Sequence, residues 1–332
     1  MVSTTPVLLI AWKRPELTRQ VINCLREVAP ERMYVACDGP RSTVDGDLEK
    51  IVATRRVIDA GIDWPCQLEQ LYFETNQGCR MGVIQAINWL FSHESEGIIL
   101  EDDCLPHKDF FLYCTDLLER YRDDTRIWSI CGSNFQQGHQ RGAASYFFSI
   151  HGDSWGWATW KRAWKHFDQA KDDWPMFKES AQFDQVFQII DEREYWSDIL
   201  DELFIHGRPD TWDYQWWLAG WMNHALHAWP NTCLVSNLGF DGDGTHTFGD
   251  SPFAAIPLEP LGSLQHPQFV APDGEADRYA FLHRRGGLQR IKHHRHRHWH
   301  VWSARWLNFK QQGPLRYISG KLTDKLNGRL QF

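Results

Sequence analysis

Three consecutive acids follow a short apolar run in the first third of the chain. The run at 98–100 leads directly into Glu101, Asp102 and Asp103. Its shortness and its β-branched residues predict a buried strand rather than a helix. Adjacent carboxylates repel one another unless a cation compensates, and hard divalent cations prefer oxygen ligands. The stretch therefore predicts a metal site with Asp103 as a ligand, although an acidic surface turn accounts for it equally well.

The elements around these acids alternate regularly between strand and helix. Strands are predicted at 6–12, 33–37, 68–73 and 97–103, and helices at 15–28, 48–60, 83–91 and 110–121. This alternation predicts a parallel sheet with helices on both faces. Right-handed crossovers would place the carboxyl ends of these strands on one rim.

Charged residues follow several of the predicted strands. Arg14, Asp38, Arg80 and the acids 101–103 all fall at or just beyond strand ends. In open α/β sheets, ligands bind in the crevice outside these ends. Each residue alone is also explained as a solvated loop side chain, but together they predict a nucleotide site beside the metal site.

The chain after residue 150 loses this alternation and becomes rich in aromatic residues. Further strands are predicted at 127–131, 146–150 and 233–236, and helices at 158–167, 196–204 and 218–226. Two acids, Asp210 and Asp213, lie among four aromatics in RPDTWDYQWW. Aromatic surroundings can raise the pKa of a carboxyl group toward a value suited to general base catalysis.

Sugar transfer from a nucleotide diphosphate would use such a set of residues. It needs positive charge at the leaving diphosphate and a base for the acceptor hydroxyl. Asp213 is the candidate base with Asp210 as its rival, and a helix N-terminal acid is the alternative explanation of Asp213. His246 would be a metal or diphosphate ligand, or a solvated loop residue. Trp155 and Trp157 would stack on a sugar or pack in the core. Glu101 and Asp102 would orient the ribose.

Composition limits the classes of protein to consider. The chain has 332 residues and a net charge of −8. Residues from 284 onward carry twelve Lys or Arg and one acid, so this tail has a net charge of +11 and the preceding residues −19. This asymmetry argues against a general nucleic-acid binder and for a localised anionic partner of the tail. The eight Cys show no zinc spacing, and no apolar run or secretory signal predicts export, so a cytoplasmic protein is expected.

The basic tail also contains an aromatic repeat. Trp299, Trp302 and Trp306 recur at helical spacing within HHRHRHWHVWSARW. Such a stretch is typical of an amphipathic helix on anionic lipid, which would place the protein peripherally on the inner face of the membrane. Metal binding by the His residues and packing against the body are the alternatives.

Two segments carry a resemblance to a known family. LEDDCLPHKDFFLYC and PVLLIAWKRPELTRQVINCL are similar to the acidic metal motif and the first strand and helix of GT-A-type glycosyltransferases, in particular the N-acetylglucosaminyltransferase I group and its bacterial relatives. The resemblance covers roughly residues 5–247. It implies a Rossmann-like GT-A fold with a mostly parallel central sheet, helices on both faces and a C-terminal extension.

The same resemblance implies roles for individual residues. Arg14 would contact the nucleotide, Asp38 the uracil, and Asp103 a manganese ion, with magnesium as a substitute. The segment around Trp212 and Asp213 resembles the stretch that carries the base, but WDYQW lacks a second adjacent acid, so Asp210 and Asp213 both stay open. The implied reaction is inverting transfer from a UDP-sugar to a glycan or lipid-linked acceptor in polysaccharide synthesis.

Two other functions and a domain division complete the expectations. A sugar nucleotidyltransferase would carry a Gly-rich loop where this chain has AWKRPEL, and a carbohydrate-binding protein would leave the acids unexplained. The expected domain is 1–248, with a nucleotide-binding half at 1–131 and an acceptor half at 132–248. A Pro-rich linker and the basic tail are expected at 249–332.

Overall fold

The computed structural model describes residues 4–167, 170–240 and 251–292. The chain divides into two compact units, 1–280 and 281–332. Every strand and the helices α1–α9 belong to the first unit, and α10 (Gly274–Arg284) crosses the division. The predicted Pro-rich segment is irregular from 251 to 273, where it is described, and belongs to the first unit. Two hydrogen bonds hold it there: Leu261 N donates to Asp109 (2.9 Å), and Asp273 N donates to the carbonyl of Phe148 (2.7 Å).

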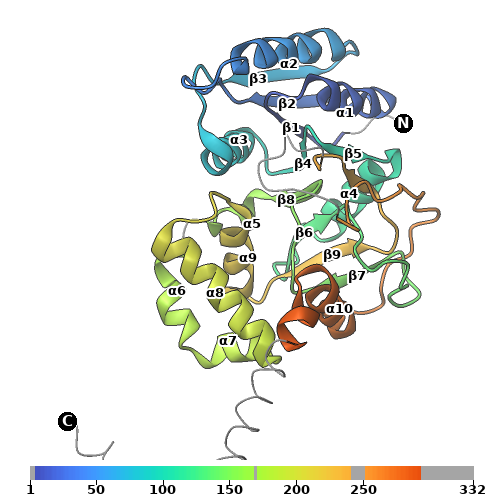
Figure 1. Cartoon of the computed structure of the whole chain (residues 1–332). Coiled ribbons are helices and arrows are strands. Elements are labelled where there is room, and N and C mark those ends of the chain that lie inside the picture. The colour runs from blue at the N-terminus through green and yellow to red at the C-terminus, as the bar shows by residue number, and fades with distance from the viewer. Residues whose placement is uncertain (1–3, 168–169, 241–250, 293–332) are drawn as a thin grey trace, which may run out of the picture. The chain divides into compact units, whose positions relative to one another are not determined.

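The first half alternates as the sequence predicts (Figure 1). Its strands are β1 (Val7–Ala11), β2 (Arg32–Cys37), β3 (Gln67–Tyr72) and β4 (Glu96–Glu101), and its helices are α1 (Pro15–Val28), α2 (Asp47–Gly61), α3 (Gly78–His93) and α4 (Lys108–Arg120). Proline at the first position suits the start of α1, where its missing N–H would have no helical partner. That helix ends at Val28, and the capping residue Ala29 adopts the left-handed conformation just before Pro30.

These strands form part of one eight-stranded sheet with the order β3-β2-β1-β4-β8-β6-β9-β7. The other members are β6 (Ile127–Cys131), β7 (Tyr146–Ser149), β8 (Trp157–Trp160) and β9 (Leu226–Pro230). β8 runs antiparallel to β4 and β6, and β7 antiparallel to β9, while the remaining neighbours are parallel. β5 (Cys104–Pro106) and β10 (Val235–Asn237) form a separate antiparallel pair. The sheet is therefore mostly parallel, as predicted.

Helices cover both faces of the sheet because the strands are apolar on both sides. Val7 and Leu9 of β1 pack in one core with α1, α2 and α4, whereas Leu8 packs in another with α3. The remaining helices are α5 (Lys161–Trp164), α6 (Ala170–Lys178), α7 (Ala181–Val186), α8 (Ile190–His206) and α9 (Asp213–Met222). Buried residues of α5 and of α7–α9 extend this second core. The α/β fold with helices on both faces confirms the predicted fold class.

Two predicted helices are wrong in part. The helix expected at 158–167 begins as β8, and only Lys161–Trp164 is helical, because Trp157–Trp160 pairs with β4 and β6 in the sheet. The helix expected at 218–226 ends at Met222, and Leu226 starts β9. Both errors concern apolar runs that fit a buried strand as well as a buried helix.

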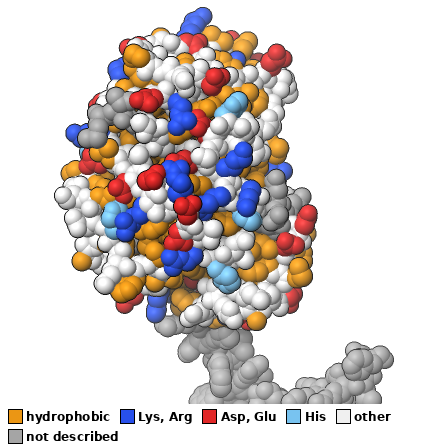
Figure 2. Space-filling model, turned by 180° about the vertical axis from the view of Figure 1, so that it is seen from behind, with side chains coloured by type: hydrophobic (Ala, Val, Ile, Leu, Met, Phe, Trp, Pro, Cys, Tyr) orange, Lys and Arg blue, Asp and Glu red, His pale blue; other side chains and the backbone are white. Residues whose placement is uncertain are grey.

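The surface seen from behind carries charges of both signs (Figure 2). Lys and Arg side chains interleave with Asp and Glu along the middle of this face, and do not gather by sign. Among the described residues, no helix is both long and apolar enough to cross a membrane.

Candidate functional site

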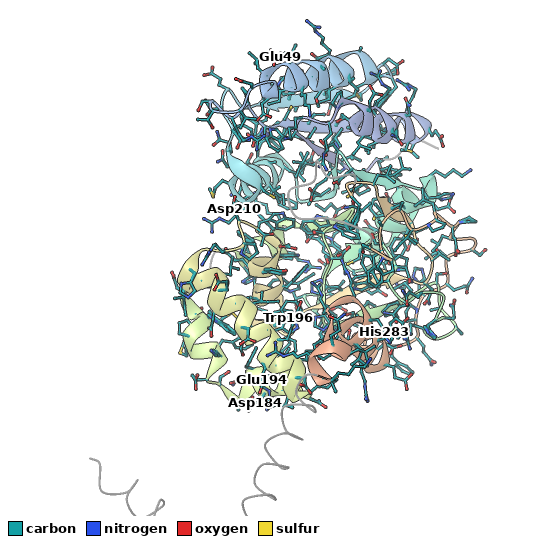
Figure 3. The ribbon with its side chains drawn as sticks, in the orientation of Figure 1. Glu49, Asp184, Glu194, Trp196, Asp210 and His283 are labelled. Atoms are coloured by element: carbon teal, nitrogen blue, oxygen red, sulfur yellow. The ribbon has the colours of Figure 1, made fainter. Side chains whose placement is uncertain are left out.

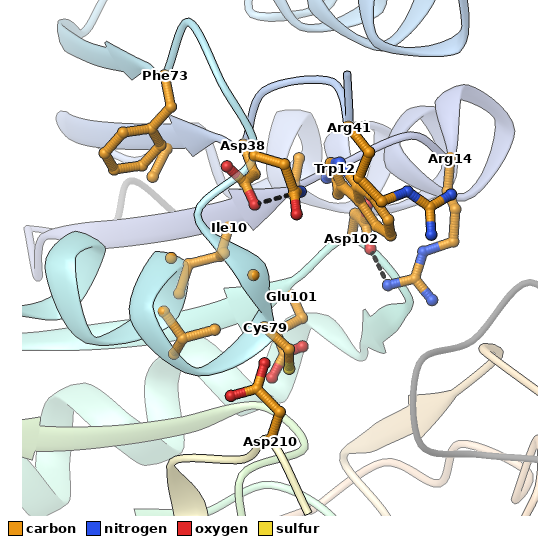
Figure 4. A pocket seen from close by; sticks show the side chains of 16 residues that line it. Ile10, Trp12, Arg14, Asp38, Arg41, Phe73, Cys79, Glu101, Asp102 and Asp210 are labelled. Carbon is orange, nitrogen blue, oxygen red and sulfur yellow. Dashed lines mark hydrogen bonds and ion pairs between the residues drawn. The ribbon is translucent and has the colours of Figure 1, made fainter. Parts of the chain in front are cut away.

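A cavity of about 260 Å³ opens at the carboxyl ends of β1, β2 and β4. The strand order reverses here, because β2 lies on one side of β1 and β4 on the other. Such a switch point is where open α/β sheets bind ligands. Figure 4 shows the side chains around the cavity. Its lining consists of Ile10, Ala11, Trp12, Arg14, Ala36, Asp38, Arg41, Phe73, Asn76, Gly78, Cys79, Gly82, Val83, Glu101, Asp102 and Asp210.

Arg14 bridges two of the three strand-end acids. Its Nη1 donates to Asp103 Oδ2 (2.7 Å) and its Nη2 to Asp102 Oδ1 (2.5 Å). The backbone N–H of Trp12 donates to the other oxygen of Asp102 (2.9 Å). Asp102 and Asp103 are buried, and the Arg14 side chain is 16% exposed. The guanidinium therefore supplies the positive charge that the sequence led us to expect from a metal ion.

Burial and charge act against each other in this cluster. Burial opposes the charge on Arg14, but the carboxylates of Asp102 and Asp103 outweigh it and raise its pKa. Burial raises the pKa of Asp102, while Arg14 lowers it. Glu101 has no such direct partner, and burial together with the charge of Asp103 raises its pKa to about 8. Burial and the neighbouring carboxylates therefore favour the neutral form of Glu101.

The described residues do not fit a bound divalent cation as they stand. Across 4–167, 170–240 and 251–292, no three His, Cys, Asp or Glu side chains are grouped so as to hold a metal ion. Asp103, the predicted ligand, directs Oδ2 at Arg14. His246, the second predicted ligand, lies outside the described residues.

Asp38 joins the turns that follow β2 and β3. It accepts hydrogen bonds from the backbone N–H groups of Gly39 (2.7 Å) and Gln77 (2.8 Å) and from Asn76 Nδ2 (2.8 Å). Burial raises its pKa against these N–H donors. The predicted uracil contact of Asp38 stays a prediction, and in this structure the carboxylate shapes the cavity wall.

One candidate base, Asp210, lies on the side of the cavity opposite Asp38 in Figure 4, and the other, Asp213, does not line the cavity. Asp210 lines the cavity and points toward Cys79 and Glu101 in Figure 4, and Figure 3 places it just below α3. Its Oδ1 lies 3.7 Å from Nε of Arg80, and both side chains are partly exposed. Asp213 is the first residue of α9 and accepts hydrogen bonds from the Thr211 hydroxyl and the Tyr214 N–H (3.0 Å).

The surroundings of Cys79 show that Glu101, Asp210 and Asp213 lie near one another. Burial raises the pKa of its thiol, and the charges of Glu101, Asp213 and Asp210 raise it further. Residues from β4, the start of α9 and the loop before it therefore meet at the N-terminal turn of α3. The structure brings together the two candidate bases, Arg80 and the strand-end acids, all of which the sequence singled out.

The two tryptophans predicted to stack on a sugar have different environments. Trp157 is 1% exposed, and its ring stacks on that of Trp212 (centroids 5.5 Å apart, interplanar angle 23°). It offers no face to a ligand and fills the core, which was the alternative prediction. Trp155 is partly exposed and contacts the rings of Phe135 and Phe240 edge-on. Its predicted role stays open.

Four residues of the site went unnoticed in the sequence. Trp12 directly follows β1, and the centroid of its ring lies 4.9 Å from the guanidinium carbon of Arg41, which is itself hydrogen-bonded to Asp47. Asn76 lines the cavity. Gly239 lies against the Arg14 cluster instead: the preceding Leu238 N donates to the carbonyl of Asp103 (2.8 Å), and a Cβ on Gly239 would lie 3.0 Å from Arg14 Nη1. The strand-end rule that found Arg14 would also have found Trp12, Arg41 and Asn76. No sequence signal marks Gly239.

The predictions for the basic tail cannot be compared with the structure. Residues 293–332, including Trp299, Trp302 and Trp306, lie outside the described residues. The membrane and metal interpretations of this tail therefore stay predictions.

Comparison with known proteins gives only distant likenesses. No family model and no curated protein matches the sequence. A UDP-glucose pyrophosphorylase solved with UDP-glucose is similar at 10% identity and a TM-score of 0.30, over 50% of this chain and 80% of its own. A 4-diphosphocytidyl-2C-methyl-D-erythritol synthase from Anaerococcus prevotii is similar at 10% identity and a TM-score of 0.31, over 60% and 84%. The glycosyltransferase GlyE of Streptococcus pneumoniae is similar at 11% identity and 0.31, over 67% and 62%. Likenesses at this level carry no argument about function.

Proposed function

We propose that this protein is a glycosyltransferase that moves a sugar from a nucleotide-diphosphate donor, UDP-linked, to a hydroxyl group of a glycan or lipid-linked acceptor. One observation carries the proposal. A single cavity at the switch point of the sheet combines Arg14, Glu101 and Asp102 with Asp210 from the opposite side. Ligand binding at such a crevice is the general property of open α/β sheets.

The lining of the cavity suits the parts of a nucleotide sugar. The Trp12 and Phe73 rings and the Asn76 amide offer stacking and hydrogen bonding to a planar base. Arg14 and Glu101 line the same cavity and are the groups proposed to meet the diphosphate and the sugar. Guanidinium groups bind phosphate oxygens bidentately, so Arg14 is the group proposed to meet the diphosphate.

The proposed reaction is a single displacement at the anomeric carbon. The acceptor oxygen forms the new bond to that carbon as the bond to the donor diphosphate breaks, which inverts the centre. The acceptor proton passes to a carboxylate, for which Asp210 and Asp213 are the candidates. Asp210 is favoured by its place on the cavity wall, whereas Asp213 is engaged as the first residue of α9.

A thermal-shift screen of UDP-, GDP-, dTDP- and CMP-sugars, each with manganese and with EDTA, tests the proposal. We expect one nucleotide to raise the unfolding temperature, because a ligand that binds only the native state stabilises it by mass action. The Asp210→Asn and Asp213→Asn variants should keep that shift, and the variant that lacks the base should lose transfer. No shift with any nucleotide would refute the donor site. Release of pyrophosphate from a nucleoside triphosphate and a sugar phosphate would instead identify a nucleotidyltransferase.

A further inference from the structure

A second cavity, of about 650 Å³, lies at the other end of the sheet from the cavity that holds Arg14. Its lining includes Leu226, the first residue of β9, and Arg126, which directly precedes β6. Both strands run parallel to β4, because β8 is antiparallel to β4 and to β6, and β9 is parallel to β6. The second cavity therefore lies at the amino ends of parallel strands, whereas the proposed donor site lies at their carboxyl ends.

Two carboxyl groups of the second cavity are almost completely buried. Glu192 of α8 and Asp277 of α10 are 6% and 8% exposed. Oε1 of Glu192 lies 3.1 Å from Nε2 of His151, but no group in the described part of the chain donates a hydrogen bond to Oε2. The Ser149 hydroxyl donates to Asp277 Oδ1 (2.5 Å) and accepts from the His151 N–H (2.9 Å), so Ser149 and His151 connect the two acids. A buried carboxylate oxygen without a donor is unfavourable, and this one faces a cavity.

The positive charge nearby does not balance these two carboxylates. His151 carries at most one positive charge. Arg126 lines the cavity but is bonded through two nitrogens to Asp124. Arg278 also lines the cavity, and among the described residues no ion pair joins it to either acid. When both acids are ionised, this part of the cavity has a net negative charge.

The lining selects among the cations that such a charge attracts. Burial raises the pKa of Asp277 to about 6, and the charge of Glu192 adds to this shift while His151 opposes it. A cation bound between the two carboxyl groups would lower that pKa and be stabilised in return. Within the ranges that the structure describes, no three His, Cys, Asp or Glu side chains are grouped to hold a metal ion. The other walls are largely apolar, formed by Ile150, Val186, Ile189, Trp221, Ala225 and Leu226.

We propose that the second cavity binds a small primary amine, with the ammonium group between Glu192 and Asp277 and the carbon chain against the apolar walls. An ammonium group has three N–H donors, which is enough to meet both carboxylates at once. Such hydrogen bonds between charged groups are the stronger ones. Arg278, which is exposed at the same cavity, would meet an anionic group at the other end of a zwitterionic amine. The inference does not depend on the proposed donor site.

Isothermal titration calorimetry on the full chain at pH 7.5 tests the inference with ethanolamine, phosphoethanolamine and ethylene glycol, the last as an uncharged analogue. We expect ethanolamine to bind with a Kd of about 1 mM or lower, and ethylene glycol about tenfold more weakly or not at all. Glu192→Gln and Asp277→Asn each remove one charge at nearly constant size, and each should weaken ethanolamine binding about tenfold. The matched control is Glu275→Gln on the same helix, where the side chain is 92% exposed, and it should bind ethanolamine like the wild type.

The outcomes decide on the site and on the class of amine. No binding of either amine at millimolar concentration overturns the inference, and so does wild-type affinity in both cavity variants or equal affinity for ethanolamine and ethylene glycol. Tighter binding of phosphoethanolamine than of ethanolamine, with the gain lost in Arg278→Gln, identifies a zwitterionic ligand; equal or weaker binding identifies an amine without an anionic group. If Glu192→Gln does not fold, Asp277→Asn carries the test, because removing a buried charge should not destabilise the protein at pH 7.5.

Discussion

Gly239 offers a direct test of how tightly the Arg14 cluster is packed. Replacing it with Ala adds one carbon that would lie 3.0 Å from both Asp103 Cγ and Arg14 Nη1 and would overlap Asp103 Oδ2. The backbone of Gly239 does not need a left-handed conformation, so the cost of Gly239→Ala is purely steric. Either the loop at 238–240 must move outward or the Asp103 carboxylate must turn away from Arg14.

The expected loss of stability in Gly239→Ala is that of an added carbon in a packed site. Forcing an extra carbon into a packed site costs about 1–3 kcal/mol. A domain of this size loses about 2–4 °C of unfolding temperature for each kcal/mol. We therefore expect Gly239→Ala to unfold roughly 2–12 °C below the wild type.

The assay is thermal unfolding followed by circular dichroism, with Gly274→Ala as the matched control. Gly274 also lacks a left-handed conformation, and a Cβ there would meet nothing within 4 Å. This control should unfold within about 1–2 °C of the wild type, since surface substitutions usually change stability by less than 0.5 kcal/mol. An unchanged unfolding temperature in Gly239→Ala would refute the close packing of this loop on Asp103.

Three further predictions concern other parts of the molecule. Burial raises the pKa of Asp277 to about 6 from an ordinary 3.8. The contribution of this group to stability is therefore fully present below pH 3.8 and is lost as the pH rises through 6, by about 3 kcal/mol. The advantage of Asp277→Asn in unfolding temperature should therefore grow between pH 4 and 7.5, and a constant difference would contradict this. Trp157→Ala should cost about 3–5 kcal/mol in urea unfolding, and the partly exposed Trp155→Ala clearly less. Asp38→Ala leaves the N–H groups of Gly39 and Gln77 without this acceptor, so both the unfolding temperature and nucleotide affinity in calorimetry should fall; a loss of affinity at unchanged stability would point to direct base contact instead.

The sequence by itself determined the parallel half of the fold and the location of the site. Apolar runs of five or six residues alternate with amphipathic helices up to residue 121, and this pattern admits few topologies. Because parallel strands end on one edge, the residues after those strands had to converge. Arg14, Asp38 and the acids 101–103 could be placed together for that reason alone.

The second half depended on contacts that no local pattern reveals. Trp157–Trp160 is a strand because β4 and β6 offer partners on both sides, although its sequence suits a buried helix equally well. Because of the same packing, Trp157 is a buried core residue, although the sequence also allowed it to stack on a sugar. Tertiary context overrides local preference most easily in such short apolar runs.

Only the tertiary structure decided how the charges at the site are compensated. The sequence shows three adjacent acids and, 87 residues earlier, an arginine, but it does not show that one guanidinium reaches two of the carboxylates. From the sequence alone, a metal ion and an arginine are equally acceptable as the positive charge that compensates these acids. The choice between them depends on distances of a few ångströms, which are set by how β1, β4 and the loop at 238–240 pack against one another.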